Sequence, residues 1–347
     1  FRIQLKPSDK VRNIENTKVT IKYKDEMQVA EYTPIRGFLS SMETGFLHFG
    51  MAGIKTIDYL EVTWPNGQKN FLSDIATNQT LAISASMKNE GTKLNFNSIK
   101  QNILYEEVKN AVALDFAHAE NKFDDFEKEI LLPHKQSTLG SKMAVGDVNG
   151  DGIDDVFLGN AKGASGKLFL QNVDGSFKPA TKQPWSKQKQ SEDTNAHFFD
   201  FDGDADLDLY VCSGGGGDFK PNSVQLVDRL YLNNGNGNFS VNTKVLPQTF
   251  TVSSVAVSND FDNDGDLDLF VGSRATPGNY PKADKSQLLR NDKGKFIDVT
   301  EELAPDLVKP GLVTDALWVD LDGDKIKELV VVGEWMSIKV FKHDDSS

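Results

Sequence analysis

The sequence predicts an all-β protein: a small β-sandwich-like module followed by a β-propeller, which we expect to be part of a larger one. Three observations lead to this prediction. Acidic segments begin at Asp147, Asp200, Asp260 and Asp320, at spacings of 53, 60 and 60 residues. A short apolar run rich in Val, Leu, Phe and Tyr follows each segment, as expected of a strand. The first 87 residues have strand-like alternation and no such segment.

The N-terminal module is expected over residues 1–87. The segments "TKVTIKY", "IDYLEVTWPNG" and "QTLAISAS" alternate as strands do, and Pro65, Asn66 and Gly67 are typical of a hairpin turn. A Ser/His site could be sought among Arg36, Ser40, Ser41 and His48. There is no G-x-S-x-G motif, and no Asp is placed to orient the histidine, so we favour a structural loop.

A connecting segment is expected over residues 88–140. It gathers side chains that suggest a transition-metal site, namely His118, Glu120, Asp124, Asp125 and His134. Their spacing matches no standard zinc pattern. The alternative, which we favour, is an amphipathic segment that packs its apolar side chains on the propeller, namely Phe123, Phe126, Ile130 and Leu131.

Residues 141–347 form the repeats. An alternating segment and a tight turn follow the apolar run in the first three units, as in "DRLYLNNGNGNF". Each unit is therefore predicted to be a β-meander that is too small to bury its own faces. Several such units around one axis form a propeller. The single cysteine, Cys212, lies in an apolar run and is expected to be a small buried side chain.

Oxygen donors recur at positions one, three, five and nine of each acidic segment. These residues are Asp147, Asn149, Asp151 and Asp155; Asp200, Asp202, Asp204 and Asp208; Asp260, Asp262, Asp264 and Asp268; and Asp320, Asp322, Asp324 and Glu328. Position seven can add a backbone carbonyl, from Ile153, Asp206, Asp266 and Ile326. A hard cation that takes six to eight oxygen ligands fits this set, so the sequence predicts up to four Ca²⁺ ions.

The EF-hand loop shares positions one, three, five and six, but it also needs a Glu at position twelve and flanking helices. Here position twelve lies in an apolar run and is Leu158, Val211, Val271 or Val331. The EF-hand is therefore excluded. Position six, where a sharp turn favours Gly, is Ala205 in the second loop and Lys325 in the fourth, which leaves the occupancy of the fourth loop open.

Residues 137–343 resemble the FG-GAP/VCBS repeats of integrin-type β-propellers on these loops and the strands beside them. The pieces "RGFLSS", "LHFGMAG", "VTWPNG" and "NQTL" resemble the ASPIC/UnbV domain, which is found beside such repeats in cartilage acidic protein and in large bacterial surface proteins. The resemblance implies seven blades, of which this chain would hold part, and it implies no catalytic residues.

The favoured role for Ca²⁺ is structural, because the ion would offset carboxylates that repel one another. The net charge of −13 argues against nucleic acid or anionic membrane as a partner. No apolar run approaches the roughly 20 residues of a membrane helix. Weak, extracellular-type calcium affinity fits a secreted protein or a bacterial cell surface, with the outer membrane as the expected location.

The sequence favours a non-catalytic binding or scaffold protein that contacts a protein or a glycan, as in adhesion or nutrient capture. The long segments 213–228 and 273–286 are expected to project on one face and to present Phe219, Arg274 and Tyr280. The alternative is a polysaccharide lyase or glycoside hydrolase that uses the propeller face, with Glu334 and Trp335 as candidates. Blade packing is the plainer interpretation of that pair.

Overall fold

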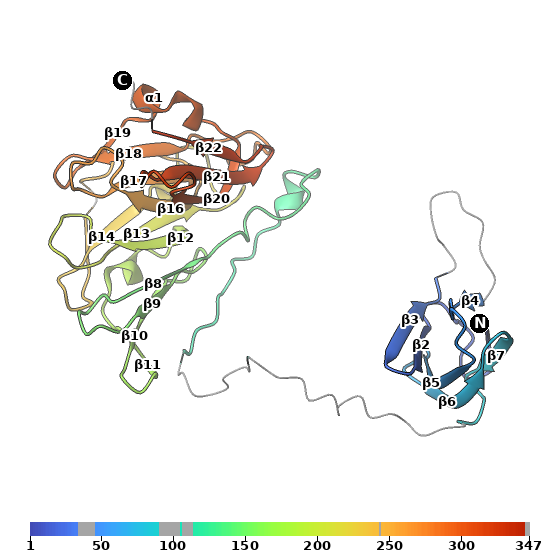
Figure 1. Ribbon diagram of the computed structural model, residues 1–347. Coiled ribbons are helices and arrows are strands. Elements are labelled where there is room, and N and C mark those ends of the chain that lie inside the picture. Colours follow the sequence, from blue (N-terminus) through green and yellow to red (C-terminus); the bar gives the residue numbers. More distant parts are fainter. Residues whose placement is uncertain (34–45, 90–104, 106–113, 243, 344–347) are drawn as a thin grey trace. The chain divides into compact units, whose positions relative to one another are not determined.

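The computed structural model describes residues 1–33, 46–89, 105, 114–242 and 244–343. The chain divides into two compact units, Phe1–Glu106 and Glu107–Ser347 (Figure 1). The regular secondary structure described in both units is nearly all β, as predicted. Among the described residues, no helix is long and apolar enough to cross a membrane.

The described residues of the first unit form two sheets. One has the strand order β3-β2-β5-β6 and the other β4-β1-β7. The strands are β1 (Arg2–Lys6), β2 (Lys18–Tyr23), β3 (Glu26–Glu31), β4 (Phe46–His48), β5 (Thr56–Thr63), β6 (Lys69–Ala76) and β7 (Thr80–Ser84). The predicted hairpin turn joins β5 to β6, and Gly67 takes a left-handed φ of +82° in it.

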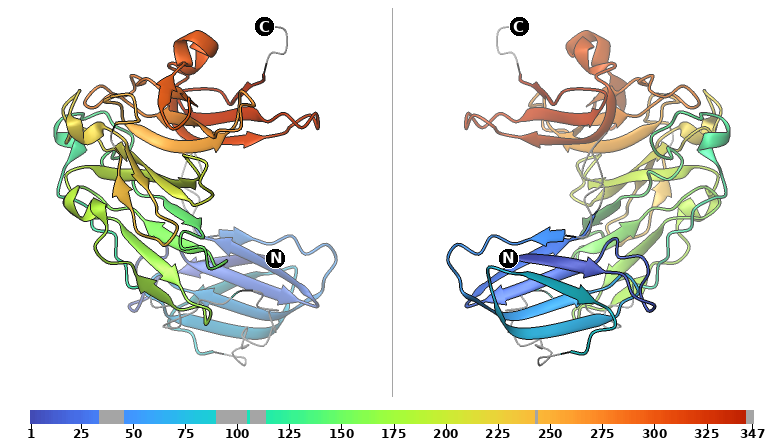
Figure 2. Two further views of the ribbon diagram at one scale, coloured as in Figure 1. Left: turned by 90° about the vertical axis from the view of Figure 1, so that its left-hand side faces the viewer. Right: turned by 90° about the vertical axis from the view of Figure 1, so that its right-hand side faces the viewer.

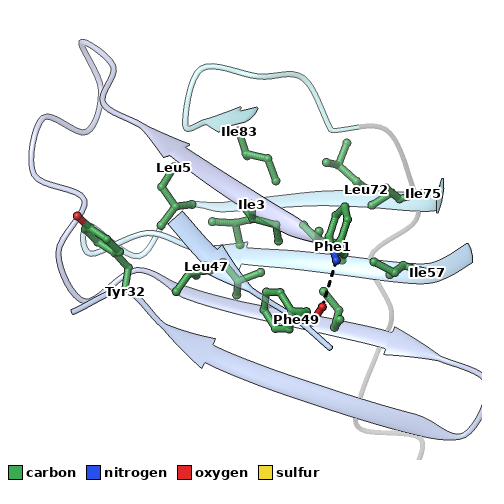
Figure 3. Packing of buried hydrophobic residues seen from close by; sticks show 14 of the residues in the cluster. Phe1, Ile3, Leu5, Tyr32, Leu47, Phe49, Ile57, Leu72, Ile75 and Ile83 are labelled. Carbon is green, nitrogen blue, oxygen red and sulfur yellow. Dashed lines mark hydrogen bonds between the residues drawn. The ribbon is translucent and has the colours of Figure 1, made fainter. Parts of the chain in front are cut away.

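Both sheets contribute side chains to one apolar core, as Figure 3 shows. In β1 the burial alternates, so that Ile3 and Leu5 point inward. The ammonium group of Phe1 donates to the carbonyl of Phe49 at 3.2 Å and closes the edge of this core (Figure 3). The β-sandwich-like prediction is confirmed for this unit.

Where the structure describes the second unit, its strands form four antiparallel meanders, which we call blades one to four. Blade one is β8 (Met143–Gly146), β9 (Asp155–Leu158), β10 (Lys167–Gln171) and β11 (Phe177–Pro179). Blade two is β12 (Glu192–Phe199), β13 (Asp208–Gly214), β14 (Arg229–Leu232) and β15 (Ser240–Val241). Blade three is β16 (Ser253–Asn259), β17 (Asp268–Ser273), β18 (Gln287–Asn291) and β19 (Phe296–Asp298). Blade four is β20 (Leu312–Val319), β21 (Glu328–Glu334) and β22 (Lys339–Phe341).

Helical turns in the described residues are short. They are α1 (Thr300–Leu303) and four 3₁₀ turns at Asp125–Glu127, Pro184–Lys187, Val224–Leu226 and Pro305–Leu307. The blades follow one another in chain order (Figure 2), and their first strands, β8, β12, β16 and β20, are neighbours in that order. One apolar layer fills the space between each pair of adjacent blades. The arrangement is propeller-like, as predicted.

A hydroxyl at a β-bulge joins neighbouring blades at their first strands. Thr194 lies in the bulge of β12, and its hydroxyl donates to the carbonyl of Ser253 in blade three at 2.6 Å. Ser254 lies at the matching bulge of β16 and donates to Val313 of blade four at 2.7 Å. Thr314 occupies the third such bulge, and its hydroxyl donates within its own sheet, to Val332 at 3.3 Å. The bulge therefore provides a repeated polar link between blades.

The predicted packing of the connecting segment is wrong for three of its four apolar side chains, whereas Phe123 is half-buried. Ile130 and Leu131 are 78% and 90% exposed, and Phe126 is also exposed. The segment is instead held by a buried polar side chain, since Asp125 accepts backbone N–H bonds from Gln136 and Ser137 at 3.2 and 3.1 Å. Hydrogen bonding to a buried carboxylate therefore helps to fix this part of the chain.

Candidate metal centres

Each acidic segment forms the loop between the first and second strands of a blade, so the four loops recur at the same place. We number the loop positions from Asp147, Asp200, Asp260 and Asp320. Position twelve lies within a strand in all four loops, which confirms that these are not EF-hands.

The carboxylate at position one organises its loop by accepting backbone N–H bonds. Asp147 accepts from Gly150 at 2.8 Å on Oδ1 and from Gly152 at 2.7 Å on Oδ2. Position one accepts from positions four and six in loops two and four as well, and from positions five and six in loop three. Burial raises the pKa of Asp147, but these donors together outweigh it and leave the pKa below its usual range.

Positions four and six have left-handed backbone in every loop. At position six φ is +82° for Gly152, +71° for Ala205, +97° for Gly265 and +75° for Lys325. Ala205 and Lys325 therefore adopt the glycine-like conformation despite carrying a Cβ, which is strained for an L-residue. The repeated conformation turns successive side chains inward.

Carboxylate oxygens converge in three of the loops. In each group one oxygen per residue lies within 4.8 Å of the others, and the groups are Asp200, Asp202 and Asp204; Asp260, Asp262 and Asp268; and Asp320, Asp322 and Glu328. The first loop has an amide, Asn149, at position three. Two buried oxygens in the loops, Asp206 Oδ1 and Glu328 Oε1, accept no hydrogen bond. An oxygen-only donor set with unsatisfied buried oxygens fits Ca²⁺.

The residue at position nine is buried at the start of the second strand. Asp208 accepts from the backbone N–H of Phe201 at 3.0 Å and from that of Asn233, beyond the third strand, at 2.8 Å. Asp155 and Asp268 make the equivalent pairs of bonds. Position nine thus links the loop to two strands, a structural task that the sequence did not indicate.

Burial also governs the acidity of position nine. It raises the pKa of Asp208 to about 7 and that of Asp268 to about 6, and neighbouring loop carboxylates add to the effect. It raises the pKa of Asp155 too. These groups resist ionisation in the protein alone, whereas a bound cation would favour their charged form.

The fourth loop differs because an ammonium group lies against it. Lys342 bonds the carboxylates of Asp322 and Asp324, and this hydrogen bonding lowers the pKa of Asp322. A lysine that already neutralises two donors competes with a metal ion for them. Together with Lys325 at position six, Lys342 makes this loop the weakest of the four candidates.

A second polar cluster lies away from the loops, and we call it the Glu334 cluster. Glu334, at the end of β21, has Oε1 2.9 Å from Arg274 Nη2 and 3.4 Å from His134 Nε2, and its Oε2 is 3.4 Å from the Tyr280 hydroxyl. Trp335 follows; it is 70% exposed, has φ +58°, and donates from Nε1 to Tyr280 at 2.7 Å. The blade-packing interpretation of Trp335 is therefore wrong.

The segments 213–228 and 273–286 border one hollow, which Gly215–Gly217, Arg274 and Tyr280 help to line. The side chains that they present differ from those predicted, because Phe219 and Arg274 are each 6% exposed. Phe219 packs on Leu226 and Val252, and Arg274 is turned inward to Glu334. Tyr280 remains accessible at this rim.

Two further candidates from the sequence are the Ser/His set and the cluster of the connecting segment. Arg36, Ser40 and Ser41 lie outside the described residues, and His48 is an exposed residue of β4. In the connecting segment, His118 pairs with Glu120 at 2.8 Å, whereas His134 contacts Glu334. Asp125 is committed to backbone N–H groups, so the five side chains do not share one site.

An amide that the sequence analysis did not identify links each of the first two loops to the next blade. Asn233 donates from Nδ2 to the carbonyl of Val148 in the preceding loop at 2.7 Å, and Asn291 donates to Phe201 at 2.8 Å. The recurring Asn after the third strand of blades two and three was the available signal.

Meander blades with a loop of converging oxygens between the first two strands define a repeat protein of the propeller type. Family models identify these repeats. The FG-GAP-like repeat matches residues 147–211, 222–271 and 260–331, just over half of the chain, and ASPIC and UnbV matches residues 8–90. The chain belongs to the FG-GAP-like repeat family, with an ASPIC/UnbV domain ahead of the repeats. No curated protein matches the chain.

Glycine at position six of loop two should stabilise the protein. Ala205→Gly removes the strain of a left-handed Cβ, and we expect a gain of about 1 kcal/mol in the free energy of unfolding. The measurement is urea unfolding followed by circular dichroism. Ala164→Gly is the control, because Ala164 has no left-handed φ, and it should be neutral or destabilising. A loss of stability in Ala205→Gly would contradict the strain.

In EDTA, stability should fall as the pH rises from about 4 to about 7. Asp208 and Asp268 have a raised pKa when folded, so in this window the native state binds more protons than the unfolded state. Thermal melting at several pH values checks this. Saturating Ca²⁺ should weaken the dependence, because the ion binds the ionised carboxylates. A melting temperature that climbs across the window in EDTA would be the opposite of the expected result.

Proposed function

We propose that this binding or scaffold protein is stabilised by Ca²⁺ and acts outside the cell or at a bacterial cell surface. The observation that carries the proposal is the recurrence of converging carboxylates in the same loop of successive blades. Up to four ions would bind, with the fourth loop the weakest. Each ion would offset like charge and hold the first strand of a blade to the second. A role in catalysis is not needed to account for the loops.

The partner would contact the face that carries the Glu334 cluster. Exposed Trp and Tyr side chains are typical of binding surfaces, because they offer large rigid area at low entropic cost. Trp335 combines 70% exposure with a left-handed backbone that is unfavourable for a bulky residue. Strain kept at an exposed aromatic residue supports a binding role. A glycan or a protein at the surface is the proposed partner, in an adhesion or nutrient-capture complex.

A second candidate function is a polysaccharide lyase or glycoside hydrolase. The observation that favours it is the meeting of His134, Arg274, Tyr280 and Glu334, since acid, base and cation are groups that such chemistry uses. The ion pair of Glu334 with Arg274 favours a carboxylate that orients its neighbours over one that donates a proton. We therefore place this function second.

Calcium should raise the melting temperature. An ion that binds only the native state contributes about 2.7 kcal/mol per site at 100 times its Kd. Calorimetric melting in EDTA and in excess Ca²⁺ checks this, together with titration calorimetry of the chelated protein. The variant Asp260→Asn/Asp262→Asn should bind one ion fewer, and Asp306→Asn, an exposed position outside the loops, should bind as many as wild type. Identical melting curves with and without calcium would refute the structural role.

The two functions differ in their response to Trp335→Ala and Glu334→Gln. For a binding protein, glycan-array or pull-down signal should drop about tenfold or more in Trp335→Ala, as for an aromatic hot spot, and no polysaccharide should be cleaved. For an enzyme, wild type should turn over a member of a polysaccharide panel, and Glu334→Gln should abolish turnover. Lys122→Ala, an exposed position outside the cluster, is the control for both.

A further inference from the structure

Three segments far apart in the sequence bring oxygen side chains together beside blade two. Glu192, the first residue of β12, is 1% exposed. The side chain of Asp218, in the loop after β13, is 4% exposed. Asn121, from the connecting segment, donates from Nδ2 to Asp218 Oδ2 at 3.3 Å. We call these three residues the Glu192 site; none of them belongs to an acidic loop.

Each residue of the Glu192 site has a buried oxygen that accepts no hydrogen bond. These atoms are Glu192 Oε2, Asp218 Oδ1 and Asn121 Oδ1. Among the described residues, the other buried side-chain oxygens without a partner are Asp206 Oδ1 and Glu328 Oε1, which lie in the acidic loops. A buried polar atom left unpaired costs about 1–3 kcal/mol. Asn121 is bonded to Asp218, and the charge of Asp218 acts on Glu192, so the three unpaired oxygens belong to neighbouring residues and indicate a missing positively charged partner.

The surroundings of the site are negative. Burial, followed by the charges of Asp218, Glu120 and Asp193, raises the pKa of Glu192 to about 8, and Lys162 opposes them. Asp193 is already neutralised by Arg229 at 2.7 Å. Lys162 Nζ is 3.3 Å from Asp218 Oδ2, the oxygen that already accepts a hydrogen bond from Asn121. Asp218 Oδ1 therefore remains unpaired.

A glycine leaves room beside the unpaired carboxylate oxygen. Gly215 has φ +116°, and a Cβ on it would lie 3.3 Å from Glu192 Oε2 and 2.4 Å from the ring of Phe219. A side chain at this position would crowd the oxygen and displace the phenyl ring that packs beneath Lys162 Nζ, 4.3 Å away. The absence of a side chain at Gly215 therefore leaves Glu192 Oε2 uncrowded on that side.

We infer that Asn121, Glu192 and Asp218 bind a further Ca²⁺ ion, separate from those of the four loops. Two carboxylates and an amide carbonyl are hard oxygen donors, with no nitrogen or sulfur that would select a transition metal. Ca²⁺ accepts the irregular geometry of three unrelated segments more readily than Mg²⁺, which demands a regular octahedron. The ion would connect the segment around Asn121 to blade two.

The test counts Ca²⁺ ions per chain by equilibrium dialysis of the EDTA-treated protein. Glu192→Gln/Asp218→Asn should bind one ion fewer than wild type, whereas Asp306→Asn should bind the same number. Asn121→Ala lies outside every strand and should weaken that same ion at least about tenfold without unfolding a blade. Circular dichroism in EDTA identifies any variant that fails to fold.

A second measurement follows the connecting segment itself. In wild type, Ca²⁺ should slow proteolytic cleavage near Asn121, and in Asn121→Ala it should not. The loop variant Asp260→Asn/Asp262→Asn should keep this protection, so failure of the loop sites and failure of the Glu192 site are distinguishable. An unchanged ion count in both Glu192-site variants, or protection of Asn121→Ala equal to wild type, would overturn the inference.

Discussion

A buried carboxylate at position nine of each loop is the constraint on which the blades depend. In the first three blades, one oxygen of Asp155, Asp208 or Asp268 accepts a loop N–H, and the other accepts an N–H at the end of the third strand. The same side chain therefore fixes the loop and the order of the strands. A buried carboxylate is costly to ionise, so the loop that contains it gains from a cation nearby.

Two of the loops are also hydrogen-bonded to the next blade. The amide of Asn233 reaches the loop of blade one, and that of Asn291 reaches the loop of blade two. A change in loop conformation, such as that caused by the loss of an ion, would thus alter the contacts of the next blade as well as those of its own blade. Apolar layers fill the space between the blades, and the amides add directed polar links to them.

Local patterns made the repeat and its loop positions predictable, because alternate donors and a left-handed sixth position are properties of nine consecutive residues. Other features depended on distant neighbours. β3 is an edge strand whose Met27 and Val29 face solvent. A pattern that assigns apolar residues to the buried face of a strand therefore does not indicate its orientation. The Glu334 cluster draws on positions 134, 274, 280 and 334, and only the order of the blades brings these together.

The bulge hydroxyls of Thr194 and Ser254 bear on how such a protein can evolve. Blade three receives this bond from blade two on its own first strand and donates one forward to blade four, so one blade carries both the acceptor and the donor. A blade duplicated in tandem would find, on the first strand of its neighbour, the acceptor that its bulge hydroxyl requires. Repeat proteins of this kind can gain or lose whole blades while the same hydrogen bond joins each neighbouring pair. Thr314 carries the same hydroxyl at the bulge of blade four.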